Sequence, residues 1–122
     1  MFSDTTPEYW FEISKHDQDA VSQLLNIGSH PDIIIYHMHQ AIEKQLKGFI
    51  LQNGGKLQFI HDLEKLFQIL MDHNNSFLQA KDAVIGLHSY FSDLRYPVSD
   101  FLNQSDLLDA SSYYQLLLDE FC

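Results

Sequence analysis

Residues 36–50 constrain the fold of this 122-residue chain more than any other part of its sequence. If each residue advances by about 100°, as in an α-helix, the apolar side chains of this stretch gather on one side. They belong to Met38, Ala41, Ile42 and Phe49. The side chains on the opposite side belong to Tyr36, Gln40, Glu43 and Lys47. The pattern predicts an amphipathic helix that packs with one face and shows a polar stripe on the other.

Further helices are predicted on both sides of this one by the same period. The first begins at Pro7, with Thr6 as its N-cap, and ends at Gly28. The others cover residues 31–52, about 61–72, about 77–93, and a final segment capped by Ser105. No strand pattern competes, because the β-branched run at 33–35 lies inside a longer helical period. We therefore predict an all-α fold with one domain over residues 1–122, an antiparallel up-and-down bundle of four or five helices.

Composition and charge narrow the class of protein. The formal net charge of −10 argues against binding nucleic acid with the whole surface, although a local basic site stays open. No apolar run is long enough to span a bilayer, and the first residues lack the pattern of a signal peptide. The single cysteine, Cys122, has no internal disulfide partner. We expect a cytoplasmic protein that does not enter a membrane.

The seven histidines do not form a recognisable metal motif. None of them is spaced by three or four residues from another, and His37 and His39 would point about 160° apart on a helix. A metal site assembled from distant helices stays open. The sequence also lacks the Gly-x-Ser-x-Gly motif and a glycine-rich phosphate loop. We expect no metal, no cofactor and no catalytic residue.

Two charged residues allow more than one interpretation. Asp17 lies along the apolar stripe of the first helix, where we favour a boundary position with a hydrogen bond over a functional role. Arg95 lies at the end of the fourth predicted helix. It can bind helix carbonyls and pair with a nearby carboxylate, or its guanidinium can bind a phosphate. Physical chemistry alone favours the first role.

Four segments between Trp10 and Pro97 carry a family resemblance. They are Trp10 with Asp17, Ala20 and Leu24–Leu25; the block Gln40-Ala41-Ile42-Glu43-Lys44-Gln45-Leu46-Lys47-Gly48; His61-Asp62-Leu63-Glu64-Lys65-Leu66; and the turn from Tyr90 through Arg95-Tyr96-Pro97. In this order they resemble the HEPN domain family (higher eukaryotes and prokaryotes nucleotide-binding). The last predicted helix matches that family only in kind.

The resemblance implies a helical bundle that forms a homodimer and binds a minimal nucleotidyltransferase in a toxin–antitoxin-like system. The abundance of aromatic residues, six Tyr and nine Phe, also favours a dimer. Some HEPN proteins are metal-independent ribonucleases with a His four to six residues after an Arg. No His follows Arg95 at that spacing, so the likeness favours a branch that binds a nucleotide, a partner protein or both without catalysis. The alternative is a ribonuclease that uses Arg95 with a non-standard base such as His61.

The same resemblance suggests which residues bind. Glu43 and Lys47 would line a polar groove with His61 and Arg95 that receives a nucleotide or a loop of the partner. The alternative is that Glu43 and Lys47 form a solvated surface pair and that His61 caps the third helix. The residues expected to bind a ligand or partner are Glu43, Lys44, Lys47, His61, Arg95 and Tyr96.

Overall fold

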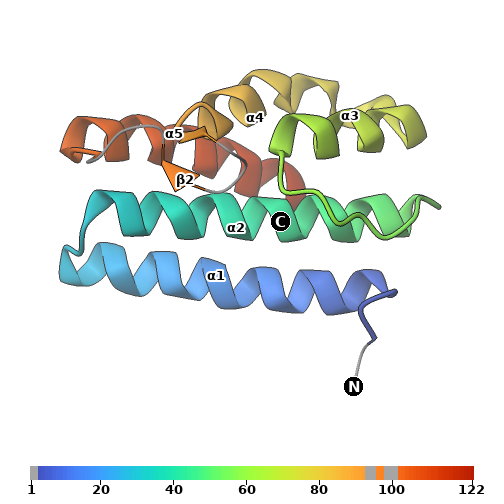
Figure 1. Cartoon of the computed structure of the whole chain (residues 1–122), viewed down its shortest axis with the longest axis horizontal. Helices are drawn as coiled ribbons and strands as arrows, with labels where there is room; N and C mark the ends of the chain where they lie inside the picture. Colours follow the sequence, from blue (N-terminus) through green and yellow to red (C-terminus); the bar gives the residue numbers. More distant parts are fainter. Residues whose placement is uncertain (1–2, 93–95, 98–101) are drawn as a thin grey trace.

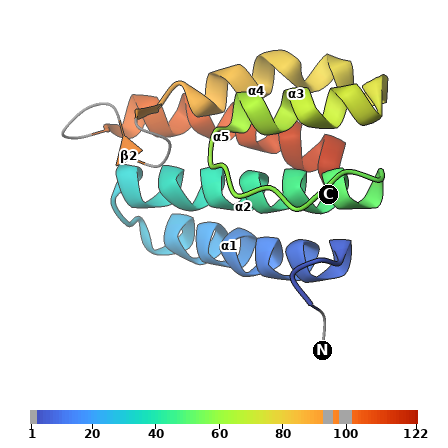
Figure 2. The same ribbon diagram turned by 45° about the vertical axis from the view of Figure 1, so that its right-hand side comes forward.

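The helix predicted around residues 36–50 lies at the centre of the molecule. The computed structural model describes residues 3–92, 96–97 and 102–122. Helix α2 (Pro31–Gln52) runs antiparallel to α1 (Pro7–Ile27) and also contacts α3 (Leu63–His73) and α5 (Gln104–Phe121) (Figure 1). Helix α4 (Lys81–His88) packs on α3 and α5, so α3 and α4 form a layer on the side of the bundle away from α1 (Figure 2). The prediction of an all-α helical bundle is confirmed.

The α1–α2 hairpin follows the sequence closely. Helix α1 begins at Pro7 and ends where Gly28 adopts φ 68°, a left-handed conformation that glycine reaches without steric cost. Thr6 occupies the N-cap, although its side chain makes no capping hydrogen bond. The two helices approach closely at Gly48, where an added Cβ would lie 2.4 Å from the Phe11 ring. The lack of a side chain at Gly48 thus lets the start of α1 pack closely against the C-terminal part of α2.

The third helix begins later than predicted. The Asp62 side chain accepts hydrogen bonds from the backbone N–H groups of Glu64 and Lys65, which makes it the N-cap of α3. Helix α3 therefore starts at Leu63 and leaves His61 in the connection that follows α2. The alternative role of His61 as the cap of this helix is wrong.

The fourth helix is shorter than predicted and is followed by paired strands. A 3₁₀ segment, η1 (Asn75–Ala80), contains the non-helical residue Phe77 (φ −100°, ψ 17°) and precedes α4. Strand β1 (Phe91–Ser92) then pairs antiparallel with β2 (Tyr96–Pro97). The prediction of one continuous helix from about residue 77 to 93 is therefore wrong, because its first turns belong to a 3₁₀ segment and α4 ends at His88, before the two-residue strand β1.

The last helix is capped two residues before the predicted cap. The Asn103 side chain accepts from the backbone N–H of Asp106, and the Asp106 carboxylate accepts from the backbone N–H of Asn103. This reciprocal capping box fixes the start of α5. Ser105 lies inside the first turn of the helix instead of at its cap.

Helix α2 supplies much of the core and is covered on most of its circumference. Its fully buried apolar side chains are Ile34, Ile35, Met38, Ala41, Ile42, Leu46 and Ile50. The predicted polar stripe does not face solvent at Glu43 and Lys47, which are only 3% and 4% exposed. The prediction that these two side chains face solvent is wrong, because α1 and the connection between α2 and α3 cover that side of α2. No helix in the described ranges is sufficiently long and apolar to cross a membrane.

Candidate functional site: a buried carboxylate beside an aromatic cavity

The Glu43 carboxylate organises the polar groups on the covered side of α2. Its Oε2 atom lies 3.1 Å from Lys47 Nζ, one helical turn further along α2. The same oxygen lies 3.0 Å from His61 Nδ1, so the connection before α3 contributes a second donor. Glu43 and Lys47 are both buried. Each charge needs the other, because either one alone would be costly to bury. The alternative of a solvated surface pair is wrong.

Lys47 also contacts α1. Its ammonium group lies 5.3 Å from the centroid of the Trp10 ring, within the range of a cation–π interaction. The indole N–H of Trp10 donates to the backbone carbonyl of Asp4 at 2.7 Å, which fixes the orientation of the ring. The Lys47 charge is therefore held between a carboxylate and an aromatic face.

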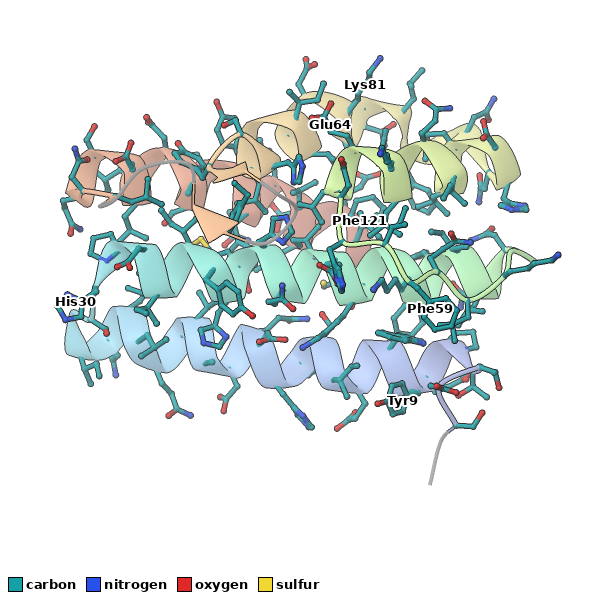
Figure 3. The ribbon with its side chains drawn as sticks, viewed as in Figure 1. Tyr9, His30, Phe59, Glu64, Lys81 and Phe121 are labelled. Carbon is teal, nitrogen blue, oxygen red and sulfur yellow. The ribbon has the colours of Figure 1, made fainter. Side chains whose placement is uncertain are left out.

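A cavity of about 290 Å³ opens beside this group. Lys47 and His61 supply its basic side chains, and Tyr9, Trp10 and Phe59 supply aromatic walls. Leu57, Gln58 and Asp4 complete the lining. Figure 3 shows Tyr9 on α1 and Phe59 in the connection after α2 at the same end of the molecule. This volume is close to the lower limit for small-molecule sites, about 300 Å³.

A histidine pair extends the polar groups in the other direction, and sequence reasoning missed it. His39 Nε2 lies 3.1 Å from His88 Nδ1, and His88 Nε2 lies 3.5 Å from Asp62 Oδ1. His39 is fully buried, with its ring centroid 4.2 Å from that of Phe91 in β1. Burial, reinforced by nearby His88 and His61, lowers the pKa of His39 from 6.5 to about 3. His39 is therefore a neutral imidazole at physiological pH.

Lys44 belongs to a different cluster. It pairs with Asp17 Oδ2 of α1, while Asp17 Oδ1 lies 2.9 Å from His37 Nδ1. The hydrogen bond expected for Asp17 is confirmed, and its side chain is buried. The binding role predicted for Lys44 is not tested by this contact, which ties its ammonium group to the α1–α2 packing and away from the cavity.

The turn expected to complete the site is only partly described. Arg95 lies outside the described residues. Tyr96 lies in β2, where its backbone pairs with Ser92. Residues 3–92, 96–97 and 102–122 contain no group of three or more His, Cys, Asp or Glu side chains that could hold a metal ion. The arrangement is suited to recognition, with two basic groups and aromatic walls around one cavity. Glu43 does not line the cavity itself but pairs with Lys47 and His61, which do.

The chain matches one known protein family over most of its length. The model of the HEPN domain matches residues 7–121, nearly the whole sequence. The chain belongs to the HEPN family. Searches of curated proteins and of solved structures returned no match. Membership in the HEPN family supports a role related to nucleotides or RNA, or to binding a partner protein.

Proposed function

We propose that this HEPN protein is the binding component of a two-component system with a minimal nucleotidyltransferase, and that it has no catalytic activity of its own. Its ligand is a nucleotide, the partner protein or both, and the cavity beside Glu43 is the binding site. The observation that carries the proposal is the convergence of Lys47 and His61, from two segments, on one cavity walled by Tyr9, Trp10 and Phe59.

The side chains that line the cavity favour binding of a planar ring over binding of several phosphate groups. Three aromatic side chains offer faces or edges to a base, and such stacking contributes about 1–3 kcal/mol per base in single-strand binding proteins. Glu43 already balances the charge of Lys47. The net charge of −10 also repels polyanions at a distance. A mononucleotide with one phosphate near Lys47 and His61 suits these groups best.

Thermal unfolding with and without mononucleotides, at fixed salt, tests the proposal. A ligand at 100 times its Kd adds about 2.7 kcal/mol to stability, which corresponds to roughly 10 °C for a domain of this size. Phe59 is suited to mutation because it is 81% exposed and has little packing to lose. Phe59→Ala should reduce this stabilisation to about 0.3–1.8 kcal/mol, because it removes one stacking contact, without changing the melting temperature of the free protein.

Leu108→Ala is the matched control, since Leu108 is another exposed apolar residue, 65% exposed, on α5. It should keep the full shift. If no nucleotide shifts the wild-type melting temperature, nucleotide binding is refuted. The partner role then depends on whether the wild type, but not Phe59→Ala, co-purifies with a co-expressed minimal nucleotidyltransferase. Cleavage of RNA by the unmodified protein, without metal, would contradict the absence of catalysis and favour the ribonuclease alternative.

A further inference from the structure

Two buried polar atoms face each other without a hydrogen bond in the described structure. They are His39 Nδ1 and Glu43 Oε1, 3.9 Å apart and one helical turn apart on α2. The side chains of His39 and Glu43 are 0% and 4% exposed, so bulk water does not reach them. A buried polar atom without a partner is costly, and such an atom in a native fold needs an explanation.

These two atoms end a row of titratable groups. The row runs from Asp62 through His88 and His39 to Glu43, with distances of 3.5, 3.1 and 3.9 Å between successive polar atoms. It therefore begins and ends at a carboxylate and has three gaps. A favourable contact needs one proton in each gap. Two neutral imidazoles carry only two ring N–H groups, so one gap is left with two acceptors facing each other.

A third proton removes this mismatch. With both nitrogens of His88 protonated, Nε2–H points to Asp62 and Nδ1–H donates to His39 Nε2. The proton of His39 then resides on Nδ1 and points to Glu43 Oε1. His39 stays neutral and changes only in which nitrogen carries its proton, in keeping with a pKa lowered to about 3. The added charge rests on His88, whose side chain is 12% exposed beside Asp62.

We propose that the His39–His88 pair takes up one proton between Asp62 and Glu43, and that this proton regulates the cavity formed by Lys47 and His61. The regulation rests on the proposed function of the cavity, whereas the proton uptake does not. When His39 Nδ1–H faces Glu43, the carboxylate holds Lys47 and His61 less strongly. Both basic groups then interact more strongly with an anion in the cavity, so anions bind more tightly as the pH falls.

The titratable groups that face the pair come from three parts of the described chain. Asp62 comes from the start of α3, Glu43 from α2, and His61 from the connection between these helices. Strand β1 contributes Phe91, which does not titrate. Because His61 can also gain a proton and attract an anion by itself, the experiment compares variants of the pair in which His61 is unchanged.

Nitrogen-15 NMR of the imidazole rings between pH 8 and pH 5 tests the proton uptake without any ligand. We expect both nitrogens of His88 to be protonated at the acidic end, while His39 stays neutral with its proton on Nδ1. Asp62→Asn should leave less of the doubly protonated form of His88 at the acidic end, because the carboxylate that faces Nε2 is gone. Asn still caps a helix, so α3 should be retained. His88 remaining neutral at pH 5, or His39 keeping its proton on Nε2, would overturn the proposal.

Sulfate, whose charge is constant over this range, tests the coupling to the cavity. Fluorescence of Trp10, the single tryptophan, reports binding beside Lys47. We expect the wild type to gain at least threefold more sulfate affinity between pH 8 and pH 6 than Asp62→Asn does. An equal gain in both proteins would overturn the coupling. Sulfate binding at neither pH would contradict the proposed binding site, while the proton uptake seen by NMR would stand.

Discussion

His39 makes the stability of this protein depend on pH. Its pKa is 6.5 in the unfolded chain and about 3 in the fold. Between pH 6.5 and pH 3, His39 is therefore protonated in the unfolded state and neutral in the native state. The contribution of His39 to stability is therefore fully present above pH 6.5. It is lost progressively as the pH falls toward 3, at up to about 1.4 kcal/mol per pH unit.

The pH dependence is tested by urea unfolding at pH 7.5 and 5.5. The wild type should lose stability on acidification. His39→Gln should lose less, because Gln keeps polar groups but takes up no proton. His16→Gln is the control, since His16 is exposed on α1 and should leave the slope unchanged. An equal slope in His39→Gln and the wild type would show that His39 protonates freely in the folded protein.

Because the Glu43–Lys47 pair is buried, replacing Lys47 should lower the free energy of unfolding far more than replacing an exposed, paired lysine. Lys47→Met leaves the buried Glu43 carboxylate without its cation and should cost about 3–5 kcal/mol in the free energy of unfolding. Lys15→Met removes the partner of Glu12 from an exposed pair 3.9 Å apart and should cost less than about 1 kcal/mol. Urea titration measures both. Adding Glu43→Gln to Lys47→Met should recover part of the loss, and no recovery would contradict an uncompensated charge as its cause.

At the scale of elements, the start of the last helix was misplaced because two residues compete for the N-cap position. The first and second helices were predicted correctly because Pro7 and Pro31 have a fixed φ that suits the first helical turn, and because Gly28 can adopt the left-handed conformation that ends a helix. Asn103 and Ser105 are both good N-caps, and local preference does not separate them. The choice depends on whether an acidic side chain stands three residues later to complete the capping box, as Asp106 does for Asn103.

The cap of α5 can be located by mutation. Asn103→Ala removes the side chain that accepts from the backbone N–H of Asp106 and should lower stability by about 1 kcal/mol. Ser105→Ala should change it by less than about 0.5 kcal/mol, because Ser105 is exposed within the first helical turn. Thermal unfolding of the two variants compares these positions directly. A larger loss for Ser105→Ala would place the cap at Ser105, as its sequence alone suggested.

At the scale of the whole molecule, helical period predicted the bundle but not which polar groups meet inside it. Period assigns Glu43 and Lys47 to one side of a helix, yet it cannot tell that α1 and the connection after α2 will cover that side. It also cannot bring His88 to His39, 49 positions apart in the chain. The i,i+4 spacing of His39 and Glu43 was the one available signal. Long-range contacts of this kind follow from packing, which a single sequence does not display.

The homodimer implied by HEPN membership remains a prediction at this scale. Apolar side chains stay exposed on the single chain, among them Leu25, Ile27 and Ile33 near the α1–α2 turn and Leu108 and Leu116 on α5. Burying such groups against a second copy is favourable in proportion to the apolar area removed from water. Light scattering at micromolar concentrations should therefore give twice the chain mass of 14.2 kDa.

The dependence of the dimer fraction on salt concentration distinguishes a dimer driven by apolar burial from one held together by ion pairs. Each copy carries a formal net charge of −10, so two copies repel each other before their apolar surfaces meet. Added salt screens that repulsion over about 10 Å at 0.1 M. The dimer fraction should thus rise with salt concentration if apolar burial drives assembly, and fall if ion pairs across the interface do. A mass of one chain at every salt and protein concentration would refute the dimer and leave the exposed apolar groups to a different partner.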